Sequence, residues 1–150
     1  MMTDTTEKKQ SEQTSKSDKQ IDWFLQQLVE LANSRTTTFG ITLNVGGILI
    51  SGTLIGGKRY FEGFARDFAK SLERSFGGAT DEIRRHFEQY GDIYELPPND
   101  SNASNPTFIH IENAKYFSPA GNPLPAQGGM FWRGKLSAVD GFILGALTSE

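Results

Sequence analysis

The order of polar and hydrophobic positions divides the chain into a polar beginning and one folded region. Residues 1–19 are almost entirely Thr, Ser, Gln, Lys, Glu and Asp, and no apolar residue follows Met2. Such a segment buries too little apolar surface to offset the entropy lost on ordering, so we expect a disordered polar tail. Residues 20–150 carry alternating helical and strand-like hydrophobic periods, which predict a single α+β domain.

Three stretches have the spacing of amphipathic helices. The first follows the tail, with Ser17 and Gln20 as a candidate capping box and an apolar stripe at Ile21, Phe24, Leu25, Leu28, Leu31 and Ala32. We expect this stripe to pack against a sheet. The second helix is predicted over Tyr60 to Phe76, with an aromatic-rich stripe. Gly77-Gly78 ends it, and Thr80 begins a short third helix.

Strand-like alternation appears in the segments between and after these helices. Residues 39–45 alternate apolar and polar positions, Gly46-Gly47 is a hairpin signal, and residues 48–55 form the returning strand. Gly52 inside that strand predicts a bend or bulge. After a breaker-rich loop over residues 92–106, which we expect to be mobile, the strand pattern resumes over residues 107–117 and is followed by a second loop over residues 118–129.

The last part of the chain is predicted to form a hairpin of two strands. Met130, Trp132, Gly134 and Leu136 alternate with Phe131, Arg133, Lys135 and Ser137. This alternation places two charges on one face and apolar side chains on the other. Asp140-Gly141 has the composition of a tight turn. Residues 142–147 are apolar on both faces, which predicts a fully buried strand.

These elements together predict an α+β fold built on a small, bent antiparallel β-sheet or partly closed barrel. We expect about five strands, an N-terminal helix, and helices inserted after the second strand. The pattern is also similar to that of Sm-like barrels, and this analogy supplies an alternative function, the binding of single-stranded RNA. The sequence pI of about 5.4 argues against it, because nucleic-acid binders usually carry a basic footprint. We therefore expect no nucleic-acid partner.

Composition narrows the chemistry further. The chain has no Cys, which excludes disulfides, thiolate catalysis and cysteine metal sites. The two His residues have no second ligand at metal-binding spacing, so we predict no metal, no cofactor and no catalytic residues. Gly52, Gly57 and Lys58 fit the start of a phosphate-binding loop, but Arg59 stands where Ser or Thr is required. No apolar run would span a bilayer and no signal peptide is recognisable, so we expect a cytoplasmic protein without a lipid-membrane partner.

Three blocks of the chain resemble the gas vesicle accessory protein U family. They are FGITLNVGGILISGTLIGGKRYFEGFA at residues 39–65, TFIHIENAKYF at residues 107–117 and MFWRGKLSAVDGFILGAL at residues 130–147. The most specific part is Phe131-Trp132-Arg133-Gly134-Lys135 followed by Val139-Asp140-Gly141-Phe142. The resemblance covers about Phe39 to Leu147.

The resemblance implies a non-catalytic protein associated with gas vesicles in the cytoplasm. It would bind the vesicle shell protein or other vesicle accessory proteins and influence vesicle assembly, stability or clustering. Self-association through an exposed strand edge or through the polar tail would link vesicles. We place the interaction surface at Phe131, Trp132, Arg133 and Lys135, because Trp and Arg are enriched at binding hot spots. Core packing is the alternative for Trp132.

Overall fold

The structure, a computed structural model, describes residues 20–76, 80–95 and 105–147. Within these residues it has the predicted α+β fold, with three α-helices and a six-stranded sheet. The helices are α2 (Trp23–Arg35), α3 (Gly57–Phe76) and α4 (Thr80–Glu88), with 3-10 helices η1 (Gln89–Glu95) and η2 (Leu136–Ala138). The strands are β1 (Phe39–Val45), β2 (Ile48–Ile55), β3 (Phe108–Phe117), β4 (Pro123–Leu124), β5 (Met130–Lys135) and β6 (Gly141–Leu144). The predicted tail lies outside the described residues.

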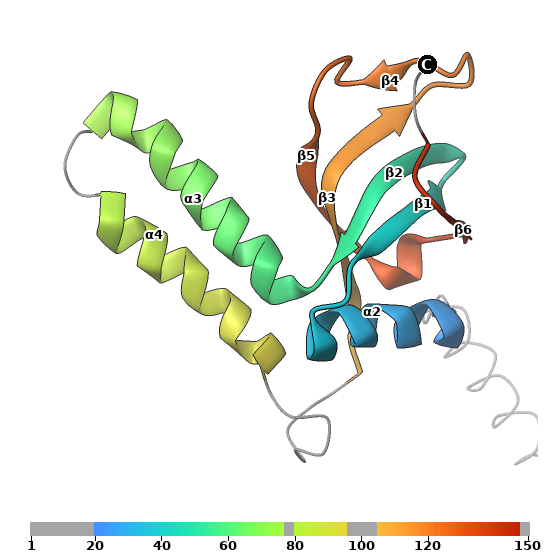
Figure 1. The fold of residues 1–150 in the computed structure, drawn as a ribbon, viewed down its shortest axis with the longest axis horizontal. Coiled ribbons are helices and arrows are strands. Elements are labelled where there is room, and N and C mark those ends of the chain that lie inside the picture. The colour runs from blue at the N-terminus through green and yellow to red at the C-terminus, as the bar shows by residue number, and fades with distance from the viewer. Residues whose placement is uncertain (1–19, 77–79, 96–104, 148–150) are drawn as a thin grey trace, which may run out of the picture.

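The strands form one antiparallel sheet that is open. β4 and β5 both pair with β3, at opposite ends of that strand, and the order continues through β2 and β1 to β6. β5 and β6 therefore lie at opposite edges of the sheet (Figure 1). Of the two predicted forms, the bent sheet is the one observed, and it does not close into a barrel. The short strand β4 lies within the segment predicted as a loop over residues 118–129.

The predicted β1–β2 hairpin and its bend are confirmed. Gly46 and Gly47 form the turn with positive φ angles of 60° and 87°. The pairing of β2 with β3 shifts register between Ser51 and Thr53, so a bulge lies at Gly52. A Cβ atom at Gly52 would come within 2.7 Å of the carbonyl oxygen of Glu112. The close approach of the β3 backbone therefore requires glycine at this position.

α2 covers one face of the sheet and forms the core with it. Leu25, Val29 and Ala32 are buried against sheet residues. This row is rotated from the predicted stripe, because Phe24 is 50% exposed and Leu31 is also exposed. The sheet touches only one narrow side of the helix, so a stripe that includes both residues is too wide to be buried.

α2 begins later than predicted. The Asp22 carboxylate accepts a hydrogen bond from the backbone N–H of Phe24 at 2.9 Å, which makes Asp22 the N-cap. The predicted capping box at Ser17 and Gln20 is therefore not the start of this helix, and Ser17 lies outside the described residues.

α3 and α4 form an antiparallel pair that extends away from the sheet (Figure 1). The predicted aromatic stripe of α3 is confirmed as packing, because the Phe68 and Phe87 rings lie 5.1 Å apart. α3 begins at Gly57, before the predicted Tyr60. Its first N–H donates to Asn33 Oδ1 of α2 at 2.9 Å, which caps the helix from a neighbouring element.

Part of the predicted loop over residues 92–106 is helical. Residues 92–95 belong to η1, which continues the chain direction of α4. Gly91 of η1 is buried, and a Cβ atom there would come within 3.0 Å of Lys58 Cα. Packing against the start of α3 therefore orders this segment, which local composition does not reveal. Residues 96–104 lie outside the described residues.

The predicted final hairpin is wrong. β5 pairs with β3 and β6 pairs with β1, at opposite edges of the sheet. The Asp140-Gly141 corner instead contacts the β1–β2 hairpin. The Asp140 N–H donates to the carbonyl oxygen of Asn44, and its carboxylate accepts from the N–H of Gly46, both at 2.8 Å. These contacts fix the chain as it enters β6.

Residues 142–147 are also not the fully buried strand that their composition predicts. Ile143 is 58% exposed and Leu144 is 77% exposed. β6 has β1 on one side, and no described strand pairs with its other side. An edge strand leaves side chains exposed that a central strand of the same composition would bury.

We predict that Gly52→Ala lowers the free energy of unfolding by about 1–3 kcal/mol, because the added methyl group overlaps the β3 backbone. Urea denaturation measures this change. Gly141→Ala is the matched control, since a Cβ atom at Gly141 meets no atom within 4 Å. Equal stabilities of the two variants would contradict a tightly packed bulge at Gly52.

Candidate functional site

The predicted interaction residues lie on β5, but they do not form one exposed surface. Trp132 packs against the core on the α2 side, in agreement with the core-packing alternative. Phe131 is half-buried against α3, and its ring lies 6.2 Å from that of Tyr60. Arg133 is also half-buried on this side, whereas Lys135 is exposed. Of the four, Lys135 is therefore exposed, whereas Phe131, Trp132 and Arg133 are half-buried.

Arg133 is held between aromatic rings. Its Cζ atom lies 3.8 Å from the centre of the Phe108 ring and 5.3 Å from that of Phe61. Its Nη1 is 3.4 Å from the Tyr94 hydroxyl oxygen. No carboxylate among the described residues forms a salt bridge with it. The positive charge is therefore stabilised by cation–π contacts and not by an acid.

The same guanidinium reaches a histidine that is completely buried. Arg133 Nη1 donates to His110 Nε2 at 2.9 Å. Because an arginine only donates, Nε2 is the acceptor and the imidazole proton sits on Nδ1. Nδ1 finds no hydrogen-bond partner within the described part of the chain. Burial and, as the smaller cause, the positive charge of Arg133 together lower the pKa of His110 to about 3.

This cluster joins the sheet to the helical arm, the name we give to α3, α4 and η1 together. Tyr60 of α3 and Tyr94 of η1 lie over the His110 ring, with centroids at 4.8 Å and 5.6 Å. Burial raises the pKa of the Tyr60 hydroxyl, and the charge of Arg133 partly opposes that change. Because the His110 imidazole is neutral and is held by a guanidinium and aromatic rings, we infer that its role is structural. It holds β5, β3, α3 and η1 together.

Sequence reasoning missed this cluster. The alternation Ile109-His110-Ile111-Glu112 places His110 on the same face as the charged Glu112, which gives no sign of burial. Its partner Arg133 lies opposite it only because β5 pairs with β3 in this register. That pairing is not encoded locally.

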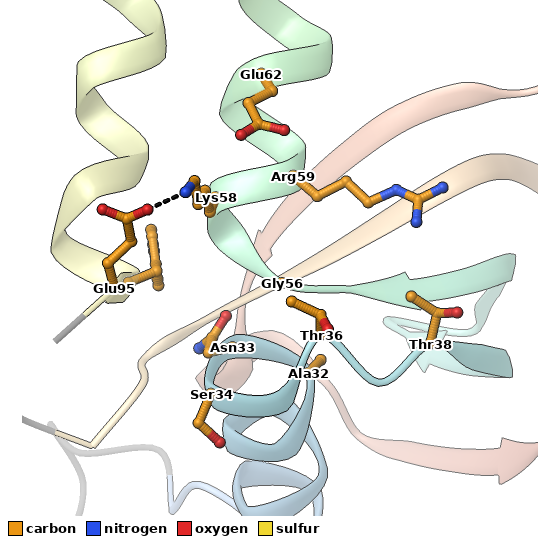
Figure 2. A pocket seen from close by; sticks show the side chains of 11 residues that line it. Ala32, Asn33, Ser34, Thr36, Thr38, Gly56, Lys58, Arg59, Glu62 and Glu95 are labelled. Carbon is orange, nitrogen blue, oxygen red and sulfur yellow. Dashed lines mark hydrogen bonds and ion pairs between the residues drawn. The ribbon is translucent and has the colours of Figure 1, made fainter. Parts of the chain in front are cut away.

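A cavity of about 750 Å³ lies between α2, the start of α3 and η1. Lys58 of the rejected phosphate-loop pattern lines it, together with the next residue, Arg59. Figure 2 shows Lys58 and Glu95 joined as an ion pair, while Arg59 extends the other way. Arg59 pairs with Glu112 of β3 at 2.8 Å. Both cations are therefore already paired with acids. The lining residues are Ala32, Asn33, Ser34, Thr36, Thr38, Gly56, Lys58, Arg59, Glu62, Tyr94 and Glu95.

A second surface combines exposed apolar residues of α2 and β6. Trp23 is 72% exposed and its ring lies 5.9 Å from that of Phe24, which in turn lies 5.8 Å from Phe142 of β6. Leu144 and Ile143 of β6 add to it from the two faces of the sheet. We call these five residues the β6 edge surface. The adjacent aromatics Trp23 and Phe24 were a possible signal, because two neighbours on a helix do not face the same core.

Two features are absent from the described residues, 20–76, 80–95 and 105–147. They contain no group of three or more His, Asp or Glu side chains arranged to hold a metal ion. None of their helices combines the length and the apolar character needed to span a bilayer.

We predict that His110 makes the protein less stable as the pH falls from about 6.5, the pKa of an unfolded histidine, toward 3. In this window the unfolded state binds a proton that the folded state does not, so stability falls by about 1.4 kcal/mol per pH unit. Urea denaturation at several values between about pH 6.5 and 5 avoids most carboxylate titration. In His110→Gln, the free energy of unfolding should depend less on pH than in wild type. His86→Gln, at an exposed position, should show the same pH dependence as wild type. Identical slopes for wild type and His110→Gln would refute the assignment.

We predict that Arg133→Met lowers the free energy of unfolding by about 2 kcal/mol, because His110 Nε2 loses its donor and the rings lose their cation. Lys135→Met is the control, since exposed substitutions stay within about 0.5 kcal/mol. Thermal or urea unfolding compares them. Comparable stabilities would mean that Arg133 does not hold the arm on the sheet.

Comparison with known proteins matches the chain to a family model. A search of the curated proteins and a search of the solved structures each returned no match. The model of the family described as "Gas vesicle protein GvpU-like" matches residues 22–147, which include every strand and helix of the described fold. This match agrees with the resemblance found in the sequence, and the chain belongs to the gas vesicle protein GvpU-like family.

Proposed function

We propose that this protein is a non-catalytic gas vesicle accessory protein that acts on vesicles in the cytoplasm. In this role it binds the shell protein or another vesicle accessory protein and influences vesicle assembly, stability or clustering. The observation that carries the proposal is the family match over residues 22–147. The matched residues include 130–147, which contain the part of the sequence that resembles the family most specifically.

The character of the described residues supports binding rather than a reaction. The most buried titratable cluster, around His110 and Arg133, holds a neutral imidazole that accepts a hydrogen bond from a guanidinium. A general base needs a lone pair within reach of a substrate proton, and this lone pair is occupied inside the fold. The cations that line the cavity of about 750 Å³, Lys58 and Arg59, are paired with acids. These features favour a scaffold that presents surfaces.

The docking surface in this proposal is the outer part of β5. Met130 is 52% exposed at one end of the strand and Lys135 is exposed at the other. Between them, Phe131 and Arg133 anchor the strand to α3. A strand that is already ordered loses little conformational entropy when a partner binds. Self-association of vesicle-bound copies then links vesicles, through a strand edge or the tail of residues 1–19.

We predict that the full-length protein floats with purified gas vesicles and that Lys135→Glu reduces the bound fraction several-fold. The charge reversal opposes a docking contact at β5 without touching the core. Lys70→Glu, at an exposed position of α3, makes the same change of charge elsewhere and should bind like wild type. A version without residues 1–19 separates vesicle binding from clustering, which imaging of the floating layer records.

The outcomes separate the parts of the proposal. Protein that stays in the bulk while vesicles remain dispersed would refute direct binding to the shell. Flotation of Lys135→Glu at the wild-type level would leave shell binding intact and remove β5 as the docking surface.

A further inference from the structure

The outer side of β6 carries hydrogen-bonding groups that no described strand uses. The N–H of Gly145 donates to the carbonyl oxygen of Gly40 on β1 at 2.9 Å. Because inward and outward groups alternate in an antiparallel ladder, Ile143 also bonds toward β1. The N–H and C=O groups of Phe142 and Leu144 therefore point to the open side. Figure 1 shows β6 at this edge of the sheet, beyond β1.

The side chains at this edge are apolar and uncharged. No charged residue occurs between Gly141 and Leu147. Ile143 and Leu144 are mostly exposed, and Trp23 and Phe24 extend the β6 edge surface on the α2 side. Natural sheets usually protect open edges with charges, prolines or bulges, because an unprotected edge pairs with other strands.

The opposite edge of the same sheet has those protections. β4 and the segment after it contain Pro123 and Pro125, and β5 carries Arg133 and Lys135. The pairing of β5 with β3 also shifts register between Ile111 and Ala114. The contrast indicates that the β6 edge is left open for a partner strand.

The sequence favours a second copy of the chain over its own tail as the occupant. Residues 1–19 have only Met1 and Met2 as apolar residues, so they offer little to cover Trp23, Leu144 or Ile143. A second β6 is apolar and uncharged, so two copies meet without like-charge repulsion. Antiparallel pairing of two β6 strands also continues the antiparallel order of the whole sheet.

We propose that β6 pairs with β6 of a second copy about a two-fold axis at Ile143, so that two sheets join into one. Phe142 of each copy then exchanges backbone hydrogen bonds with Leu144 of the other. β6 itself carries no charged residue, and the Asp140 carboxylate accepts from the N–H of Gly46 beside it, so no two carboxylates face each other across the pairing. Trp23 and Phe24 of both copies gather on the α2 side of the joint. This dimer rests on the proposed function in one respect, because that function includes self-association and the dimer specifies how it occurs. The dimer itself is tested without vesicles.

A disulfide experiment tests the register. Ile143 would face its counterpart in a non-hydrogen-bonded pair, where the Cα atoms are about 4.5 Å apart and within reach of a disulfide. The chain has no Cys, so Ile143→Cys introduces a single thiol. Mild oxidation of full-length Ile143→Cys should give a covalent dimer at low protein concentration. Ile93→Cys, on η1 at a 66% exposed position, should stay largely monomeric.

Sedimentation analysis of the full-length protein tests the interface without a cross-link. Wild type should dimerise reversibly, and Ile143→Lys should weaken the dimer at least tenfold while Ile93→Lys does not. Circular dichroism checks that the variants are folded. A monomeric wild type, equal dimerisation of Ile143→Lys, or equal cross-linking at both cysteine positions would overturn the proposal. Loss of the dimer on removal of residues 1–19, with Ile143→Lys unaffected, would assign self-association to the tail. Vesicle flotation is measured separately, so failure here leaves the proposed function standing.

Discussion

The packing of α2 against the sheet is the contact on which the rest of the fold depends. Among the described residues α2 is the helix that buries the inner face of the sheet, through Leu25 and Val29. Its other end also positions the arm, because Asn33 caps α3 and Ala32 lies against the β2–α3 link. A Cβ atom at Gly56 would come within 2.7 Å of the Ala32 carbonyl oxygen. The same helix, α2, therefore both buries one face of the sheet and fixes the start of α3.

The opposite face of the sheet uses a different contact. There the arm is joined through a buried histidine and a guanidinium, in a space lined by aromatic rings. A neutral His110 costs less to bury than an imidazolium, and Arg133 keeps it neutral by occupying Nε2 and by its charge. The cluster thereby stiffens β5 next to the exposed Lys135, which is the property a docking strand needs.

Features that depend on the backbone conformation of one or two residues could be predicted from the sequence. Gly46-Gly47 predicted the β1–β2 turn, and Gly52 predicted the bulge. The predicted final hairpin was wrong because the Asp140 carboxylate accepts a hydrogen bond from Gly46, in a turn distant in sequence, and does not close a turn between β5 and β6. The site was predictable only in part. Lys135 is exposed as the alternation implies, whereas the burial of Arg133 follows from the β3–β5 register, which no local pattern encodes.

The unequal edges of the sheet limit what self-association produces. If both edges were open, copies would add without end and form filaments. Among the described strands, Pro123 and the bulge beside β5 protect one edge of the sheet, and the two-fold pairing that we propose would cover the open β6 edge. The proposed dimer would carry a β5 surface at each of its far ends. If β5 docks on vesicles as proposed, these two surfaces would bind two vesicles at once, and simultaneous binding converts a modest affinity into stable bridging. In this arrangement the open edge makes the dimer, and the protected edges at its two ends remain free to link vesicles.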